Sequence, residues 1–330
     1  MALRFPQRSR QGTILIMALW SLSLLTVFAV YLGVAVRTKI TLQSRLEDRD
    51  KLYLLAESGI KKAIAVLNND LMLNEYAFTA KAKQARHNNP APLAGIALSG
   101  GKVDVSLVDE QSKIDLNKAD LPTLQRLIKY VLNLDENSTL ELAQAIYDWK
   151  EYGRSDLIGF YSEEYYKSLE SPFSAKDAPF ELLDELLLVK GMTKDIFRQL
   201  IPYVTVYGNN VININTASRI ALLAAGLEEV LVDKILNVRR GQDGLEATLD
   251  DFIFEAGDSV ILDLQKFVSL EGVELYELDE MFHRGQLGTN STHYTLRAQA
   301  SLKGQERKVI TCVFDVIHSK IVYYREEESS

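Results

Sequence analysis

The feature that most constrains the fold is an apolar run near the N-terminus. No charged residue occurs from Ile14 to Val36. As an α-helix rising about 1.5 Å per residue, this run is about 35 Å long, enough to cross the ~30 Å hydrocarbon core of a bilayer. A secretory signal peptide would instead end its apolar region after about 7–15 residues, at a small-residue cleavage site. The sequence therefore predicts a membrane helix. The helix continues past Arg37 as an amphipathic one, with apolar residues spaced by three, four and seven: Leu42, Leu46, Tyr53, Ala56, Ile60, Ile64 and Leu67.

Composition limits the rest of the chain. The 330 residues, 47% hydrophobic and 25% charged, suffice for one anchor plus one large or two ordinary soluble domains. A net charge of −8 argues against a surface for duplex nucleic acid or lipid headgroups. The single cysteine, Cys312, lies in an alternating apolar run and is expected to be a buried thiol. The four histidines have no metal-ligand spacing, and no Walker loop, GxGxxG or GxSxG motif occurs, so we expect no enzyme.

The first twelve residues, MALRFPQRSRQG, form a basic leader that ends in glycine directly before the apolar run. This arrangement resembles the class III leader of type IV pilins and pseudopilins. The resemblance implies that a prepilin peptidase cleaves between Gly12 and Thr13 and that the new amino terminus is methylated. It also implies a single pass through the bacterial inner membrane, with a cytoplasmic N-terminus and most of the chain in the periplasm. The charges flanking the span do not decide the orientation by themselves.

The fifth residue after Gly12 is Met17, where most of the family carries a glutamate that can pair with a neighbouring subunit's amino terminus. Lack of this glutamate resembles the K-type minor pseudopilin of type II secretion, as does the segment LLAESGIKKAI at residues 54–64. The resemblance covers most of the chain. It implies a structural subunit at the tip of a periplasmic pseudopilus, together with I- and J-type minor pseudopilins, that initiates assembly and supports protein export across the outer membrane. The alternatives are a plain single-pass anchor, a minor pilin of a type IV pilus, or a membrane-anchored DNA receptor.

The fold expected is α+β, with a long N-terminal helix against an antiparallel sheet and a large helical insertion. We divide the chain into a leader (1–12), a transmembrane helix (13–36), the rest of the helix with a loop and a first strand (37–110), the insertion (111–272) and C-terminal strands (273–330). Alternation predicts the early strand at 102–108 and a later meander. The three strands of that meander are expected at 293–302, 307–317 and 320–325. Helical character is expected to end at Val273.

The insertion contains an internal echo. Residues 114–128 and 212–226 each read as an extended, Asn-containing turn that leads into a helix, and Asn215 or Thr216 is expected to cap the second helix. Ser138 with Glu141 reads as a capping box. Residues 182–201, and the continuation of the second unit, resemble helix-hairpin-helix motifs. Their turns carry Thr193 and Glu228 where DNA-binding relatives usually have glycine, so we expect packing modules and no nucleic-acid partner.

The acidic stretch from Tyr147 to Tyr166 is a candidate calcium site. Calcium takes six to eight oxygen ligands, and five carboxylates could contribute here. Some K-type family members bind calcium in a related segment with the pattern D-W-x-D-x-D. This chain has Glu151 and Gly153 in place of the second and third aspartates of that pattern. The candidate ligands are Asp148, Glu151, Asp156, Glu163 and Glu164.

Overall fold

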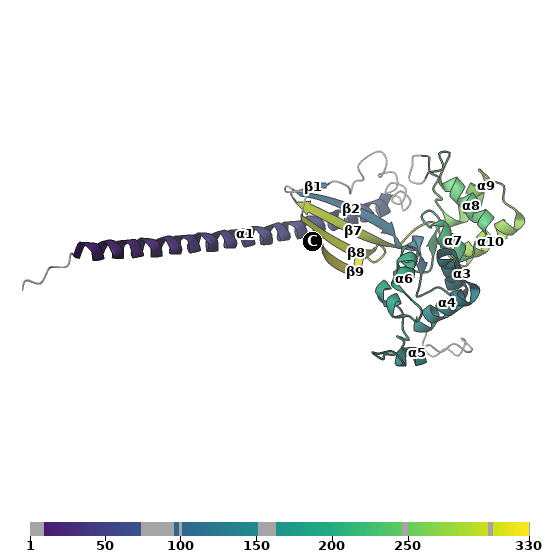
Figure 1. Cartoon of the computed structure of the whole chain (residues 1–330). Coiled ribbons are helices and arrows are strands. Elements are labelled where there is room, and N and C mark those ends of the chain that lie inside the picture. Colours follow the sequence, from purple (N-terminus) through teal and green to yellow (C-terminus); the bar gives the residue numbers. More distant parts are fainter. Residues whose placement is uncertain are drawn as a thin grey trace, which may run out of the picture. The chain divides into compact units, whose positions relative to one another are not determined.

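The structure is a computed structural model that describes residues 10–73, 96–98, 101–150, 163–245, 250–302 and 306–329. The chain forms two compact units, Met1–Leu54 and Leu55–Ser330, which are considered separately. Helix α1, Arg10–Leu73, contributes to both (Figure 1). The helix continues six residues beyond Leu67, the last residue of the predicted apolar stripe.

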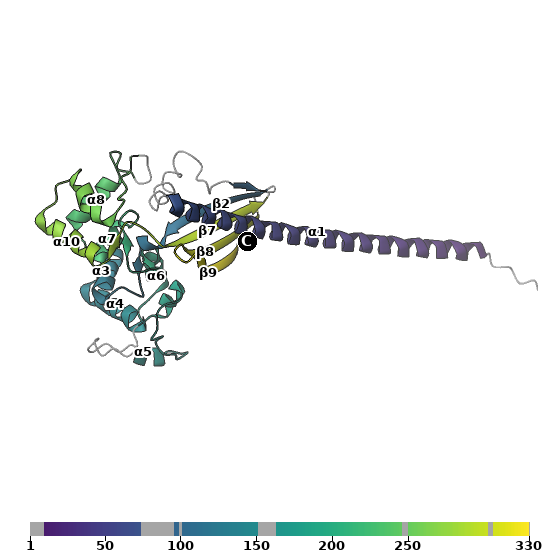
Figure 2. The ribbon, with the colours of Figure 1, turned by 180° about the vertical axis from the view of Figure 1, so that it is seen from behind.

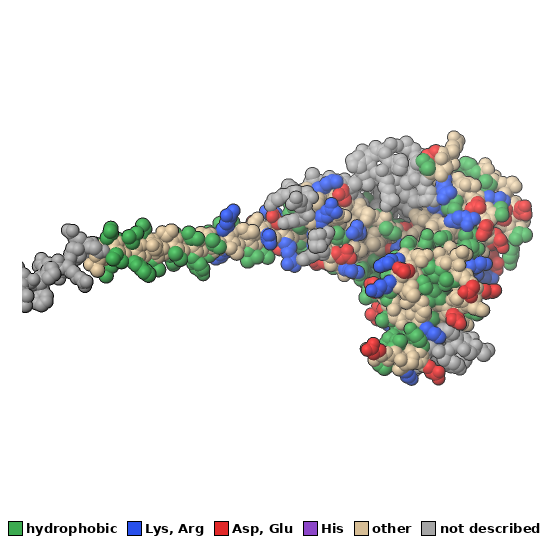
Figure 3. All heavy atoms as spheres, viewed as in Figure 1, with side chains coloured by type: hydrophobic (Ala, Val, Ile, Leu, Met, Phe, Trp, Pro, Cys, Tyr) green, Lys and Arg blue, Asp and Glu red, His purple; other side chains and the backbone are tan. Residues whose placement is uncertain are grey.

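The first unit is the apolar part of α1. Within the described residues this is the one helix long and apolar enough to cross a membrane. Its large side chains are exposed, Met17 at 71% and Trp20 at 76%, and Figure 3 shows hydrophobic side chains gathered along it. The hydroxyls in this part bond back to carbonyls one turn earlier, as Thr26 Oγ1 does to Leu22 O at 2.7 Å, so the polar side chains of an apolar helix find partners within it. The prediction of a membrane-spanning helix is consistent with this geometry.

The second unit contains a five-stranded antiparallel sheet in the order β1-β2-β7-β8-β9. Strand β2 pairs with β7, which lies almost two hundred residues later in the sequence, in the register Asp109↔Tyr294. The predicted early strand at 102–108 and the late meander are therefore confirmed, with the last strand extending to Ser329, and a short strand, β1, that was not predicted precedes the early one. The strands are β1 Ile96–Leu98, β2 Gly101–Asp109, β7 His293–Leu302, β8 Glu306–Asp315 and β9 Lys320–Ser329.

One face of this sheet is covered by the C-terminal part of α1, which Figure 2 shows in front of the strands. Alternate residues of β7, from Tyr294 to Leu302, are buried, as expected of a strand with one face on the core. Gly59 lies at a close approach to the sheet, because a Cβ there would lie 2.8 Å from Val103 Cγ2 and 3.4 Å from Ala298 Cβ. The helix therefore packs on the sheet through small residues. The helix residues buried here are Leu55, Ala56, Ile60, Ala63 and Leu67.

The helical insertion lies between β2 and β7 and consists of two halves, each closed by a two-residue parallel bridge. The first half contains η1 Glu110–Ser112, β3 Ile114–Asp115, α3 Leu121–Leu132, α4 Glu136–Lys150, α5 Glu163–Lys167, η2 Leu183–Leu188, α6 Lys194–Leu200, η3 Ile201–Tyr203 and β4 Val204–Thr205. The second half contains β5 Ile212–Asn213, α7 Arg219–Ala225, α8 Glu229–Arg239, η4 Gly257–Ser259, α9 Val260–Gln265, α10 Gly272–His283 and β6 Leu287–Gly288.

The internal echo in the sequence corresponds to a repeated structure. In the first half, the Asn117 amide donates to Phe180 O at 2.9 Å and accepts from Phe180 N at 2.7 Å. In the second half, Asn215 exchanges the same two bonds with Phe254, each at 2.9 Å. An asparagine, buried in the second half and half-buried in the first, thus holds a distant backbone segment in both halves.

Buried cations complete the repeat. Lys150, at the end of α4, donates to Ala119 O at 2.6 Å. Arg239, at the end of α8, donates to the equivalent carbonyl, Ala217 O, also at 2.6 Å. Each cation satisfies carbonyls of the turn that would otherwise be buried without a partner. The two halves then pack together through α3 and α7.

Three local expectations are wrong. Ser218, not Asn215 or Thr216, caps α7, because the Asn215 amide is engaged with Phe254. Near α4, Ser138 donates to Asp135 through its backbone and its hydroxyl, so Asp135 takes the capping role expected of Ser138.

Helical character also does not end at Val273. Helix α10 runs to His283, and β6 pairs with β5 in the second half of the insertion. The helix there keeps its inner face, at Leu278 and Met281, buried in the core of the insertion.

Candidate functional site

The predicted processing residues lie at the start of α1. Gly12 and Thr13 are helical, and Thr13 and Met17 are both exposed. Exposure of Met17 agrees with a position that would face lipid or another subunit. Cleavage after Gly12 and the assembly role of position 17 remain predictions.

The structure brings few of the predicted calcium ligands together. Asp148 is half-buried on α4, and Glu163 and Glu164 start α5, where Glu164 is exposed. Glu151 and Asp156 lie outside the described residues. Among the residues that the structure does describe, no group of three or more His, Cys, Asp or Glu side chains could hold a metal ion. The described carboxylates do not form a calcium site by themselves, so the site remains a prediction that depends on Glu151 and Asp156.

The hairpin turns have structural roles. Thr193 caps α6 by accepting from Ile196 N at 3.2 Å, and Gly226 ends α7 with a φ of 116°, which favours glycine. Glu228 occupies the N-cap position of α8. The first hairpin differs from the expected helix-glycine-helix form, since a 3₁₀ helix, η2, precedes its glycine. Both turns are used to end and begin helices.

The most organised polar cluster was not predicted. It forms the junction between the sheet and the insertion, at the consecutive residues Asp109, Glu110 and Gln111, which are only 5%, 2% and 2% exposed. The junction is where the chain leaves β2 and enters the first half of the insertion. We refer to these three side chains and their partners as the junction cluster.

Asp109 binds the second half of the insertion. Its Oδ2 accepts from Ser291 Oγ at 2.6 Å, Thr216 Oγ1 at 2.5 Å and Asn213 Nδ2 at 3.0 Å. Its Oδ1 accepts from Gln111 N at 2.8 Å. Burial raises the pKa of Asp109, although these four hydrogen bonds favour the carboxylate. One carboxylate thereby holds two segments that lie more than a hundred residues away in the sequence.

Glu110 binds the first half of the insertion and the sheet. It accepts a short bond from the Thr205 hydroxyl on β4, and it accepts from Thr295 Oγ1 on β7 at 2.7 Å. Lys113 forms an ion pair with the same carboxylate at 2.9 Å. Adjacent acids therefore bind the two halves separately, Asp109 the second and Glu110 the first.

Gln111 closes the cluster. Its amide nitrogen donates to Asn209 Oδ1 at 2.9 Å and Val211 O at 3.1 Å, in the link between the two halves. Its amide oxygen accepts from the backbone and hydroxyl of Thr292, just before β7. A run of three polar residues directly after a predicted strand was the available sequence signal, but such runs are usually solvated turns.

A second titratable group lies near the junction, at the end of β8. Asp315 accepts from His318 Nδ1 at 2.7 Å, and His293 Nε2 lies 3.7 Å from the same carboxylate. Burial alone would raise the pKa of Asp315, but the bonds from His318 and the charge of His293 lower it overall. The pKa of His293 is lowered, chiefly by burial. These two histidines, expected to be solvated, share one carboxylate.

Cys312 on β8 is fully buried, and burial raises the pKa of its thiol to about 11. The expectation of a buried thiol is confirmed.

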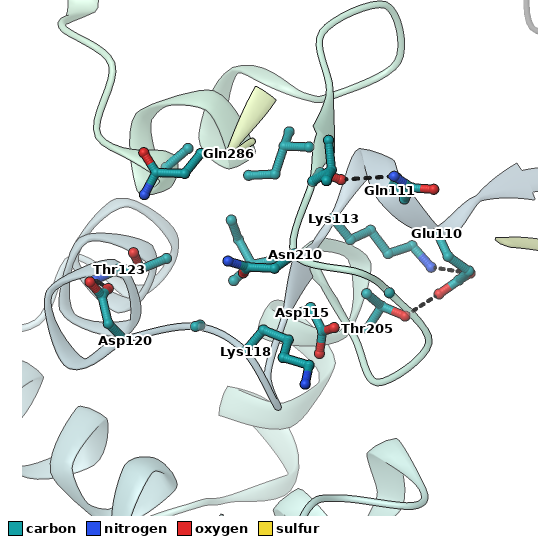
Figure 4. Close-up of a pocket in the computed structure, with 16 residues that line it drawn as sticks. Glu110, Gln111, Lys113, Asp115, Lys118, Asp120, Thr123, Thr205, Asn210 and Gln286 are labelled. Atoms are coloured by element: carbon teal, nitrogen blue, oxygen red, sulfur yellow. Dashed lines mark hydrogen bonds and ion pairs between the residues drawn. The ribbon is translucent and has the colours of Figure 1, made fainter. Parts of the chain in front are cut away.

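A cavity of about 100 Å³ adjoins the junction cluster (Figure 4). Its lining includes Glu110, Lys113, Asp115, Lys118 and Thr205. Pockets for small-molecule ligands are typically about 300–1,000 Å³ and mostly apolar, so this cavity has the size and polarity suited to a few waters. The arrangement holds two parts of the molecule together; it does not assemble a nucleophile with a base.

Known proteins similar to this chain agree with the fold. Residues 101–209 match the family model described as type II secretion system (T2SS), protein K. A putative type II secretion system protein K of Escherichia coli K12 is 24% identical over 75% of this chain and 80% of that protein. A type II secretion system protein K of Aeromonas hydrophila is 24% identical over 67% of this chain and 72% of that protein.

A third relative, the type II secretion system protein K of Klebsiella pneumoniae, is 26% identical over 39% of this chain and 44% of its own length. The crystal structure of the GspK-GspI-GspJ complex from the enterotoxigenic E. coli type 2 secretion system contains a similar fold. The TM-score is 0.58 at 17% identity, covering 86% of this chain and all of that one. The matching segment at residues 101–209, the relatives and the fold therefore all show this chain to be similar to protein K of type II secretion systems.

Proposed function

We propose that this protein is a minor pseudopilin of a type II secretion system and that its role is structural. The observation that carries the proposal is the architecture: a long apolar helix packed on an antiparallel sheet, with a two-part helical insertion between β2 and β7. The similar chain of known structure was crystallised with GspI and GspJ. By that similarity the partners of this chain are I- and J-type minor pseudopilins and the rest of the pseudopilus.

The insertion supports a position at the tip of the pseudopilus. It contains about half of the chain, and the junction cluster ties both of its halves to the strands β2 and β7. A subunit with a bulky rigid domain on its sheet is sterically suited to end a filament and unsuited to stack beneath another subunit. Met17 agrees with this position, because a thioether cannot pair with a neighbouring amino terminus as a carboxylate does.

The orientation follows from the same proposal. The peptidase that removes the leader acts between Gly12 and Thr13, the apolar part of α1 stays in the inner membrane, and residues from about 37 onward lie in the periplasm. In this role the protein initiates the pseudopilus and supports protein export. We assign it no reaction.

A deletion of the insertion tests the proposal. Because Asp109 pairs with Tyr294 in adjacent strands, residues 110–292 can be replaced by a short Asn-Gly turn that joins β2 to β7. Asp109 is changed to Ser in the same variant, since its partners in the insertion are removed. In the source bacterium we expect the variant to reach the membrane and lose its leader, but to support neither secretion nor a complex with the I- and J-type subunits.

Two controls make the result decisive. Circular dichroism of the purified variant checks that the sheet has folded, and N-terminal sequencing checks processing. A folded, processed variant that secretes normally and forms stoichiometric complexes would contradict a tip role for the insertion.

A further inference from the structure

Helices α8 and α10 form one continuous surface on the second half of the insertion. The backbone N–H of Glu228, just before α8, donates to Glu277 Oε1 of α10 at 3.0 Å. Lys234 Nζ of α8 lies 2.6 Å from Glu274 Oε1 of α10. These two contacts bracket Val230 along α8 and fix the helices side by side.

Three large apolar side chains stand exposed on this surface: Val230 at 63%, Val273 at 72% and Tyr276 at 68%. Val273 and Tyr276 are three residues apart on α10 and therefore lie on the same face of that helix. Val230 lies in sequence between Glu228 and Lys234, the two residues that contact α10. The α8–α10 surface is defined here by these three side chains and the acidic residues around them.

The acidic residues greatly outnumber the basic ones. Segments 228–234 and 271–284 together contain eight acidic and two basic residues, whereas the whole chain has 45 acidic and 37 basic. Figure 3 shows red side chains gathered over the part of the molecule where Figure 1 labels α8 and α10. The two cations are engaged within the surface, Lys234 with Glu274 and Arg284 with Glu280. Arg219 of α7 also reaches it and pairs with Glu229 and Asp233, so eight acids meet three cations and an excess of negative charge remains.

Glu277 shows the consequence of this charge. Its Oε2 is buried without a hydrogen-bond partner among the described residues. Burial, together with the nearby charges of Glu228 and Glu274, raises the pKa of Glu277. A cationic group from outside would relieve this repulsion, since Lys234 of α8 is bonded to Glu274.

We propose that the α8–α10 surface is a docking site for a segment of a partner protein that carries lysine or arginine beside apolar side chains. The apolar triplet gives such a segment its contact area, and the acids select its charge. Phosphate-bearing partners, whether nucleic acid or anionic lipid, would be repelled by the same acids. This binding site is separate from the proposed assembly role, which rests on α1, the sheet and the presence of the insertion.

Binding is measured by fluorescence anisotropy with the full chain in nonionic-detergent micelles. The probes are three short labelled peptides that combine Lys with Leu, Lys with Ser, and Glu with Leu. We expect the Lys/Leu peptide to bind, the Lys/Ser peptide to bind more weakly, and the Glu/Leu peptide not to bind. The double substitution Val230→Ser with Tyr276→Ser should raise the dissociation constant for the Lys/Leu peptide about tenfold, as loss of an apolar anchor does.

Charge is tested separately by Glu228→Gln with Asp279→Asn, two exposed acids whose replacement leaves the ion pairs of Arg219, Lys234 and Arg284 in place. This variant should also weaken binding and flatten its salt dependence. Matched controls are Ile317→Ser, an equally exposed apolar residue elsewhere, and Glu141→Gln on α4. Both should bind as the unmodified chain does. The fraction of a given peptide that binds to the micelles is the same for every variant, so it does not affect the comparison between variants.

Three results would overturn the proposal: unchanged binding by the Val230/Tyr276 double variant, an equal loss in the Ile317→Ser control, or equal affinity for the Lys/Leu and Lys/Ser peptides. If the double variant does not fold, as judged by its melting temperature, the single substitutions at these two exposed positions give the same comparison.

Discussion

At the scale of single residues, the carboxylate of Asp109 is the most heavily used side chain in the junction cluster. It receives bonds from three side chains that are themselves largely buried, from Asn213, Thr216 and Ser291. A donor left buried without an acceptor costs about 1–3 kcal/mol, more than the net gain from making a typical bond. Removal of this one acceptor is therefore more damaging than loss of an ordinary surface charge.

Asp109→Ala should lower the free energy of unfolding by about 3–5 kcal/mol, since it leaves several donors unpaired. The matched control is Asp104→Ala in the same strand, where a half-exposed carboxylate pairs with Lys102 and the expected change is below about 1 kcal/mol. Urea unfolding in detergent measures both, with the fluorescence of buried Trp149 as the signal in a Trp20→Phe background. Equal effects of the two substitutions would rule out the junction role.

Asp315 gives the molecule an acid-sensitive contact. Its pKa is lowered in the folded chain, so its contribution to stability is present above its unfolded pKa of about 3.9 and is lost as the pH falls through its lower folded value. Asp315→Asn should be less stable than the unmodified chain at neutral pH and should lose less stability on acidification. Melting temperatures between neutral pH and about pH 3 check this; parallel curves for the two proteins would show that Asp315 makes no such contribution.

Calcium binding, if it occurs, also depends on single carboxylate side chains. If Asp148 and Glu164 join Glu151 and Asp156 around an ion, millimolar calcium should raise the melting temperature, and a chelator should reverse the rise. Asp156→Asn should abolish the response while leaving the metal-free melting temperature unchanged. A melting temperature that is the same with calcium and with chelator would mean that these acids hold no structural ion.

At the scale of elements, helix α1 packs closely on the sheet at Gly59, which has no side chain. A Cβ at residue 59 would stand 2.8 Å from Val103 Cγ2, a stiff β-branched side chain. Alanine is favoured over glycine in a helix by about 1 kcal/mol, but overpacking costs about 1–3 kcal/mol. At residue 59 we therefore expect the cost of overpacking to exceed the gain in helix propensity.

Gly59→Ala should lower the free energy of unfolding by roughly 1 kcal/mol, and Gly59→Leu by clearly more. Lys61→Ala, at a largely exposed position on the same helix, should change it by less than about 0.5 kcal/mol. Urea unfolding followed by circular dichroism compares the three variants. Stabilisation by Gly59→Ala would mean that helix propensity, and not contact with β2, decides at this position.

The two halves of the insertion show how one pattern of elements serves two environments. Each has an Asn clamp, a parallel bridge and a cation under the turn. They differ at the second residue of the parallel bridge: Asn213 donates to Asp109 in the junction cluster, whereas its counterpart Asp115 lines the cavity of Figure 4. The second half is thus tied to β2 through its own turn, and the first half through Thr205 on β4.

At the scale of the whole molecule, processing and assembly depend on the start of α1. The mature protein should begin at Thr13 with a methylated amine, because the proposed peptidase cuts after Gly12. Mass spectrometry of the membrane-bound protein measures this, and Gly12→Leu should retain the leader and abolish entry into the pseudopilus. An N-terminus at Met1 in secreting cells would contradict the predicted leader, and with it the orientation.

Local patterns in the sequence were enough to predict the large elements. A charge-free run followed by an apolar stripe specifies α1, and strict alternation specifies β2, β7 and β8, because these periods are properties of single segments. The echo between residues 114–128 and 212–226 similarly indicated two related units. The predicted end of the helical region, at Val273, was wrong, because α10 runs from Gly272 to His283.

The tertiary structure alone decided what the polar residues do. Asp109 and Ser291 are separated by 182 positions, and Asn215 reaches Phe254 across 39, so neither pairing leaves a local signal. Asn215 and Glu110 both resemble ordinary cap or turn residues in isolation. Their roles arise only when distant segments bury them together, because burial makes every hydrogen bond obligatory and thereby selects the partner. The sequence by itself determined the membrane helix, the strands and the family resemblance; the folded chain determined how the insertion is held to the sheet.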